Sequence, residues 1–148
     1  MSFKGSKEDI EVVATSPPTG TVTFLFTDIE GSTKMWESHP EAMQSALVRH
    51  DVILRNAIEK RGGYVFKTVG DAYCCAFHTA PDALEAALEA QRKLLSSECQ
   101  EIGPFRVRMA LHMGAAEERD GDYFGPRLPR AARAAASRST PSLCATRS

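Results

Sequence analysis

Apolar and polar positions alternate with period two in residues 20–33, which read GTVTFLFTDIEGST. The apolar positions are Val22, Phe24 and Phe26. Threonines fill most of the positions between them, and β-branched and aromatic residues are typical of strands, so the pattern predicts a buried strand. Asp28 follows at the point where this strand is expected to leave the core.

A glycine turn and a helix start are expected directly after that carboxylate. Gly31 permits backbone conformations that other residues resist, and Ser32 or Thr33 is expected to cap the helix. The N–H groups at a helix start favour a bound phosphate. Gly31, Ser32 and Thr33 are therefore candidate substrate-binding residues.

The rest of the chain shows two longer helical patterns and three further strand patterns. Each helical pattern follows a proline, Pro40 or Pro81, and proline suits the first turn of a helix. In chain order, we expect a flexible leader over 1–19, a helix over 40–60, strands over 64–68 and 72–77, a helix from 81, a strand over 105–112 and a polar connection over 114–121. The order β-α-β-β-α-β is typical of an α+β, ferredoxin-like antiparallel sheet with its helices on one face.

Two of these patterns also predict which side chains are buried. On the helix from residue 81, Leu84, Ala87, Leu88 and Leu95 recur at helical spacing, as on the apolar face of an amphipathic helix. In residues 105–112, large apolar side chains alternate with arginine, alanine and histidine, which predicts a half-buried strand.

The composition changes sharply after Pro126. The last 22 residues have five arginines, no acidic residue and no strand pattern. We therefore expect a disordered tail rich in arginine, alanine and serine over 134–148.

Overall composition fits an ordinary globular domain. Of the 148 residues, 43% are hydrophobic and 25% are charged, and the net charge of −1 gives no general attraction to nucleic acid or anionic lipid. No apolar run approaches the ~18 residues of a membrane span, and the N-terminus lacks a signal-peptide core. We therefore expect a cytoplasmic protein with no nucleic-acid or membrane partner. The four cysteines lack C-x-x-C spacing, which argues against a zinc site.

Two carboxylates stand out by their positions. Asp28 ends the first strand, and Asp71 lies in the bend between the next two. If those strands are neighbours, both carboxylates meet at one edge of the sheet and offer the oxygen ligands that Mg²⁺ and Mn²⁺ prefer. The alternative is that Asp28 caps a helix and Asp71 caps a turn, which are common roles for aspartate.

Four motifs give a family resemblance. They are FTDIEGST at 26–33, FKTVGDAY at 66–73, RVRMALHMG at 106–114 and DYFGP at 122–126. With these motifs in this order, residues 20–133 resemble the class III adenylate/guanylate cyclase catalytic domain. The resemblance implies a ferredoxin-like fold and conversion of ATP or GTP to the 3′,5′-cyclic nucleotide and pyrophosphate. It also implies a homodimer, or a heterodimer with another cyclase chain, with the site across the interface.

The same resemblance implies roles for individual residues. Asp28 and Asp71 match the pair that holds two Mg²⁺ or Mn²⁺ ions, with the backbone carbonyl of Ile29 as a further ligand. Lys67 and Asp122 match the family's base-reading pair and suit adenine, so ATP is the expected substrate. Without the family pattern, Lys67 would be a solvent-facing strand residue and Asp122 a turn former.

Two departures from the family pattern predict impaired catalysis. Arg133 matches the arginine that stabilises the transition-state phosphate, but Pro129 stands four residues before it, where the family has an asparagine. Proline has no amide side chain and no backbone N–H, and losing one such group costs about 10²–10³-fold in rate. Family domains also continue with further C-terminal strands, which residues 134–148 are not expected to form, as in a truncated or frame-shifted product.

Three other hypotheses remain at this point. A non-catalytic cyclase homologue that binds metal–nucleotide, or dimerises with an intact cyclase, would account for Pro129. Diguanylate cyclases use the same palm-like fold, but they have a GG[DE]EF hairpin where this chain has VGDAY. A nucleic-acid binder would need aromatic residues among its arginines for base stacking, and the tail has none.

Overall fold

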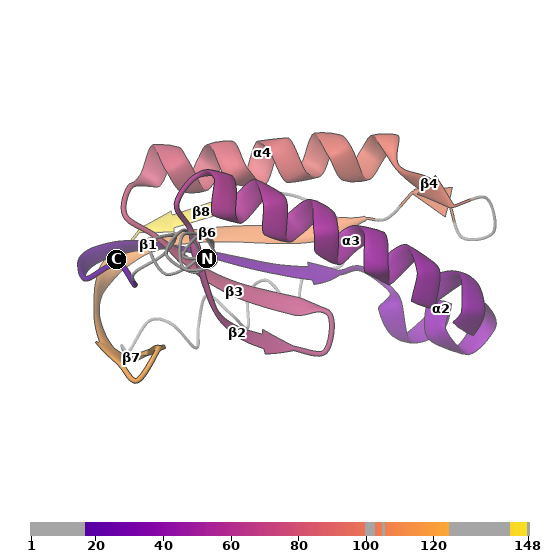
Figure 1. The fold of residues 1–148 in the computed structure, drawn as a ribbon, viewed down its shortest axis with the longest axis horizontal. Coiled ribbons are helices and arrows are strands. Elements are labelled where there is room, and N and C mark those ends of the chain that lie inside the picture. The colour runs from indigo at the N-terminus through magenta and orange to yellow at the C-terminus, as the bar shows by residue number, and fades with distance from the viewer. Residues whose placement is uncertain (1–16, 100–102, 105, 125–142, 148) are drawn as a thin grey trace, which may run out of the picture.

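A computed structural model of the chain describes residues 17–99, 103–104, 106–124 and 143–147. Figure 1 shows the elements in space. In chain order they are β1 Gly20–Ile29, α2 Ser32–Ser38, α3 Pro40–Lys60, β2 Tyr64–Val69, β3 Ala72–Phe77, α4 Ala80–Ser96, β4 Glu98–Cys99, β5 Gly103–Pro104, β6 Val107–Arg119, β7 Asp122–Phe124 and β8 Leu143–Arg147.

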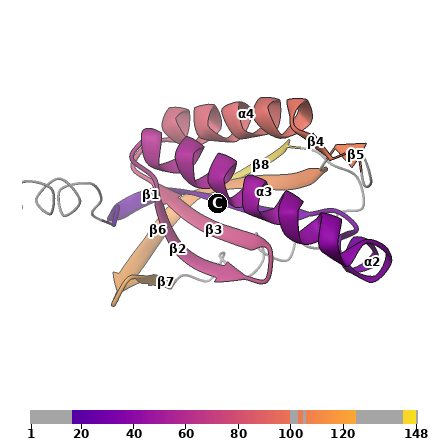
Figure 2. The same ribbon diagram turned by 45° about the vertical axis from the view of Figure 1, so that its right-hand side comes forward.

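β1 lies at the centre of the sheet, between β3 and β6, and is antiparallel to both. The strand order is β2-β3-β1-β6-β7, and β2 and β3 form an antiparallel hairpin. Helices α3 and α4 cover one face of this sheet, as Figure 2 shows from a second direction. The predicted ferredoxin-like arrangement with its helices on one face is therefore confirmed.

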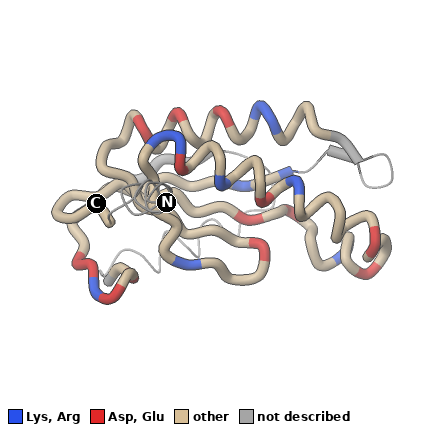
Figure 3. Tube along the Cα trace, in the orientation of Figure 1, with Lys and Arg blue, Asp and Glu red and all other residues tan. Residues whose placement is uncertain are grey.

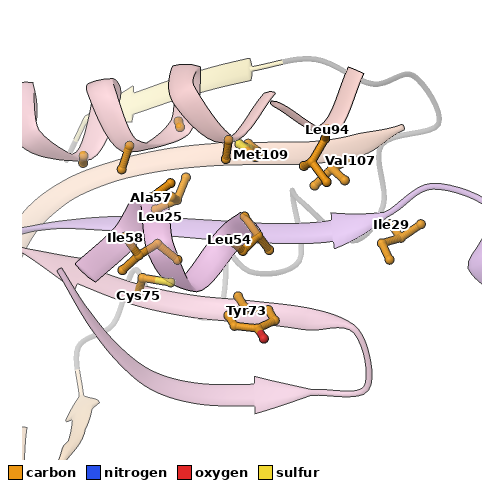
Figure 4. Close-up of a cluster of buried hydrophobic side chains, with 14 of the residues drawn as sticks. Leu25, Ile29, Leu54, Ala57, Ile58, Tyr73, Cys75, Leu94, Val107 and Met109 are labelled. Carbon is orange, nitrogen blue, oxygen red and sulfur yellow. The ribbon is translucent and has the colours of Figure 1, made fainter. Parts of the chain in front are cut away.

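The main core lies between the two long helices and the sheet. In Figure 4, Leu25 of β1 lies beside Ala57 of α3, and Leu94 of α4 lies beside Val107 of β6; all four are buried. A second cluster covers the opposite face of the sheet. Its buried members are Val22, Phe24, Phe26, Ala76, Ala110 and Tyr123. Because successive strand residues point to opposite faces, β1 is buried on both of its sides.

β6 is longer and more deeply buried than its sequence pattern predicts. It continues to Arg119, and the chain turns only at Asp120 and Gly121, so the predicted polar connection over 114–121 is wrong. Ala110 and His112 are also buried, so the strand is covered on both faces near its middle. β6 pairs with β1 at ten positions, and the backbone hydrogen bonds of this pairing stabilise the strand. The polarity of the β6 sequence alone does not predict this pairing.

The buried face of α4 is built mainly from alanines. Its buried members are Ala83, Ala86, Ala87, Ala90 and Leu94. Leu84, Leu88 and Leu95 are exposed, so the face predicted from their spacing is wrong except at Ala87. Small side chains allow the helix to approach the sheet closely, and the packing surface rather than side-chain size selects the buried face.

β8 pairs in parallel with β6, with Leu143 opposite Met109. No strand was expected in this part of the chain, so the expectation of an unstructured tail is corrected for residues 143–147. β7 pairs with β6 only at residues 117–119, so the middle of β6 presents backbone groups on that side with which a short segment can pair without a strong local pattern. Residues 1–16 of the predicted leader and the remainder of the predicted tail lie outside the described residues.

Charged positions lie mostly on the helices and toward strand ends (Figure 3). The acidic positions at the end of β1 and at the β2–β3 turn lie at the same edge of the sheet in this view. None of the described helices is long and apolar enough to cross a membrane.

Candidate functional site

Asp28 is the next-to-last residue of β1 and lies opposite Arg108 of β6. The Arg108 guanidinium donates two hydrogen bonds to the carboxylate, from Nε to Oδ1 at 2.9 Å and from Nη2 to Oδ2 at 2.7 Å. The side chains of Arg108 and Asp28 are only 13% and 14% exposed. Asp28 makes no capping bond to α2, so the alternative that it caps a helix is wrong.

Arg108 has no predicted site role, although it contacts a predicted metal ligand directly. The alternating pattern placed Arg106 and Arg108 on the polar side of a half-buried strand. The residues that these arginines contact depend on the register between β1 and β6. Because the two strands lie far apart in the sequence, no local pattern specifies that register. The sequence therefore could not identify this contact.

Burial raises the pKa of the Asp28 carboxyl above its usual range. The hydrogen bonds and positive charge of Arg108 lower this pKa, whereas the charges of Asp71 and Glu30 raise it. Burial is the largest of these effects. The negative charges of Asp71 and Glu30 act on Asp28 in the same direction, and a further cation would oppose them, because a nearby positive charge stabilises the ionised form.

Asp71 lies in the turn between β2 and β3 and reaches back to the end of β1. Its Oδ1 accepts a long hydrogen bond of 3.5 Å from the N–H of Ile29. This contact joins residues 42 positions apart, so Asp71 is not merely a local turn cap. The structure thus brings Asp28, Ile29 and Asp71 together at one strand end.

Two carboxylates and a main-chain carbonyl are a partial set of metal ligands. Within the described ranges, no group of three or more His, Cys, Asp or Glu side chains is placed to hold a metal ion alone. Mg²⁺ is commonly bound by one or two carboxylates, while waters and substrate phosphates complete its coordination. The oxygen donors of Asp28, Asp71 and Ile29 therefore fit Mg²⁺ or Mn²⁺ that binds together with a phosphate substrate.

The start of α2 follows directly after this strand end. Gly31 is the N-cap residue, with a φ of 69° in the left-handed region that glycine favours. No side chain caps the helix, so the predicted capping by Ser32 or Thr33 is wrong. Ser32 is half-buried and Thr33 is exposed. Gly31, Ser32 and Thr33 stay predicted contacts for a phosphate group.

Lys67 of β2 and Asp122 of β7 also come together. Lys67 Nζ lies 3.4 Å from Asp122 Oδ2, and both side chains are partly exposed. The N–H of Tyr123 donates to the other oxygen, Asp122 Oδ1, at 2.7 Å. This arrangement presents an ammonium donor and a carboxylate acceptor side by side to a ligand with complementary groups.

A β-bulge decides which face Lys67 occupies. The β2–β3 register shifts between Val65 and Lys67, which makes Phe66 the extra residue. Val65 packs on the main core, whereas Phe66 packs in the second cluster. Lys67 lies opposite Cys74, which also packs against the second cluster. Strict alternation would have turned Lys67 toward the helices, so the bulge places it on the opposite face, which is also the face of Asp28.

Two predicted catalytic positions, Pro129 and Arg133, lie outside the described residues. Their roles therefore remain predictions from the sequence. Of the predicted site residues, the described ranges include those for metal, phosphate and base binding.

Comparison with known proteins identifies related sequences. Residues 14–135 match the model of the adenylate and guanylate cyclase catalytic domain family. An adenylate cyclase of Neurospora crassa is 37% identical over 145 residues, which cover 81% of this chain and 6% of that protein. An uncharacterised protein of Mycobacterium tuberculosis is 41% identical over 123 residues, which cover 82% of this chain and 41% of that protein. The chain thus spans less than half the length of either relative.

Solved structures show the same fold. A Trypanosoma brucei adenylate cyclase in its monomeric state superposes with a TM-score of 0.78 at 26% sequence identity. The superposition covers 90% of this chain and 74% of that one. The sheet and helices described above therefore have the architecture of that enzyme's structure.

Proposed function

The chain belongs to the adenylate and guanylate cyclase catalytic domain family, and we propose that it acts on ATP as a nucleotidyl cyclase domain. In this reaction the ribose 3′-hydroxyl attacks the α-phosphorus, loses its proton, and expels pyrophosphate to leave 3′,5′-cyclic AMP. The observation that best supports the proposal is the meeting of Asp28 and Asp71 at one strand end.

The metal-binding half of the site would be formed by Asp28, Asp71 and the carbonyl of Ile29. Two Mg²⁺ or Mn²⁺ ions bound there would lower the pKa of the 3′-hydroxyl and neutralise charge on the triphosphate. The backbone N–H groups at the start of α2 would contact phosphate oxygens. Carboxylates that remain ionised are required for this role, and Arg108 favours ionisation of Asp28.

Lys67 and Asp122 would select the base. The Asp122 carboxylate would accept a hydrogen bond from the 6-amino group of adenine, while the Lys67 ammonium donates to a ring nitrogen. Guanine has a carbonyl oxygen in place of that amino group. This oxygen and the Asp122 carboxylate are both acceptors, so they could not form a hydrogen bond with each other. The ion pair at 3.4 Å supports this assignment because the two groups lie close enough for a single base to contact both.

We further propose that two chains complete each site, with metal-binding residues from one chain and base-reading residues from the other. The partner would be a second copy or another cyclase chain. Equal amounts of Asp71→Ala and Lys67→Ala chains, each inactive alone, should then recover about a quarter of wild-type activity, since half the dimers are mixed and each has one intact site. A mixture as inactive as its parents would contradict this arrangement.

Pro129 is expected to limit the rate. If an asparagine at this position is needed to orient the ribose, Pro129→Asn should raise the rate by about 10²–10³-fold. No increase in a folded Pro129→Asn chain would mean that a different step limits this chain.

The direct test of the activity is incubation of the purified chain with Mn²⁺ and labelled ATP. Cyclic AMP should form faster than with Asp71→Ala, which lacks one of the two carboxylates. GTP serves as the competing substrate and should be used more slowly. Equal product from the wild-type chain and Asp71→Ala would contradict the cyclase activity.

A second candidate function is supported by Pro129, which removes a group that the family uses in catalysis. In this case the chain binds metal–nucleotide without converting it. Calorimetry with Mn²⁺ and a non-cyclisable ATP analogue distinguishes the two functions. Binding without turnover supports the non-catalytic function, and an absence of both binding and turnover excludes each of them.

A further inference from the structure

Arg108 lies in the metal-binding half of the proposed site without an assigned role. Arg108 and Asp28 are direct partners across β6 and β1, so the backbone ladder holds both ends of the ion pair. The two bonds, at 2.9 Å and 2.7 Å, use both carboxylate oxygens and both sides of the guanidinium fork. Two parallel hydrogen bonds leave the carboxylate a single orientation. Most of each side chain is buried, which further restricts its movement.

This contact leaves room for a metal ion. An ionised carboxylate has about four lone-pair positions, and the guanidinium occupies one on each oxygen. One position on each oxygen of Asp28 therefore remains for a second cation. Asp71 Oδ1 lies at the neighbouring N–H of Ile29, so its carboxylate reaches the same strand end.

We propose that Arg108 is a positioning residue of the metal site, which orients the Asp28 carboxylate so that it can share a divalent ion with Asp71. Arg108 acts through Asp28 and does not contact the ion itself. Hydrogen-bonding partners of metal ligands commonly set the orientation of those ligands, and their loss weakens metal affinity. The proposal rests on the proposed function for the existence of the metal site.

The test compares the Mn²⁺ affinity of the wild-type chain with that of its variants, with no nucleotide present. The affinity is measured from the electron paramagnetic resonance signal of free Mn²⁺. Arg108→Lys keeps the positive charge but removes the planar two-donor fork. The matched control is Arg106→Lys, the same exchange at an exposed arginine two residues away. We expect Mn²⁺ affinity to fall about 10–100-fold in Arg108→Lys and to stay unchanged in Arg106→Lys.

Thermal unfolding of each metal-free variant separates positioning from stability. A purely structural role would lower the melting temperature of Arg108→Lys and leave its Mn²⁺ affinity unchanged. Arg108→Gln, which keeps a planar donor group without the charge, is measured in parallel and should also bind Mn²⁺ more weakly than the wild-type chain.

Two results would overturn the proposal. If Arg108→Lys and Arg108→Gln bind Mn²⁺ as tightly as the wild-type chain, or more tightly, then Arg108 is neutral or competes with the metal, and only this proposal fails. If the wild-type chain binds Mn²⁺ no better than Asp28→Asn, the metal site does not exist, and the metal-binding half of the proposed function fails as well.

Discussion

Gly63 joins the end of α3 to the hairpin that contains Lys67 and Asp71, and an alanine there should destabilise the fold. A Cβ atom at Gly63 would lie 2.5 Å from Cε2 of Phe77 and 2.7 Å from Cγ2 of Ile58, whereas ordinary contacts begin near 3.4 Å. Phe77 and Ile58 are both fully buried, so neither can move aside without displacing other core side chains.

The expected magnitude follows from two opposing effects. Overpacking of a buried site costs about 1–3 kcal/mol. Restricting the unfolded chain by replacing glycine returns about 0.4–1 kcal/mol. Gly63→Ala should therefore lower the free energy of unfolding by about 1–2 kcal/mol. In a chain of this size, that corresponds to a fall in melting temperature of roughly 2–8 °C.

A double-mutant cycle in urea, followed by circular dichroism, tests the cause of this loss. Phe77→Leu alone should be destabilising because it leaves a cavity, but the added methyl group of Gly63→Ala would fill part of that space. The double variant should then be more stable than the sum of the single effects by about 1 kcal/mol. Effects that add to within about 0.3–0.5 kcal/mol would refute the predicted contact between the new methyl group and Phe77.

Three further predictions concern ionisable groups and a buried hydrogen bond. Metal binding needs the ionised form of Asp28, whose pKa is raised by burial. As the pH is lowered, Mn²⁺ affinity should therefore begin to fall before the pH reaches about 4, where an ordinary aspartate titrates. Burial raises the pKa of both the half-buried Cys74 and the fully buried Cys75 thiols, but only Cys75 is closed to solvent, so iodoacetamide should label Cys74 before Cys75, as mass spectrometry can show. Tyr123→Phe removes a 2.7 Å hydrogen bond to the buried Pro18 carbonyl and should cost about 1–3 kcal/mol of unfolding free energy in a urea titration.

Each of these predictions has a result that contradicts it. Mn²⁺ affinity that stays constant down to a pH of about 4 would mean that the Asp28 pKa is not raised. Equal labelling of Cys74 and Cys75 in the folded chain would show that Cys75 is accessible. Tyr64→Phe is the control for the tyrosine variant, because the Tyr64 hydroxyl makes only a long 3.4 Å bond to the Gly121 carbonyl. An equal loss of stability in both variants would refute the special role of the buried bond.

Several elements could be predicted because their signals are local. Pro40 and the apolar spacing after it predict α3, which the structure has at Pro40–Lys60. The β2–β3 hairpin follows from two strand patterns around Gly70. The buried face of α4 could not be predicted in this way, because Leu84 has the more apolar side chain and yet is exposed beside the buried Ala83. Neighbouring elements, and not the residues of α4, decide which side faces the core.

For the candidate site, the sequence by itself determined which chemical groups stand at strand ends and turns. Asp28 and Asp71 could be recognised from their positions at the end of a buried strand and within a hairpin turn. Only the tertiary structure decided that Arg108 pairs with Asp28 and that the bulge at Phe66 turns Lys67 toward Asp122. The physical reason is that a side chain's face depends on strand register, and a shift of one residue moves every side chain to the other face. Register between distant strands is set by pairing and packing, which no local pattern specifies.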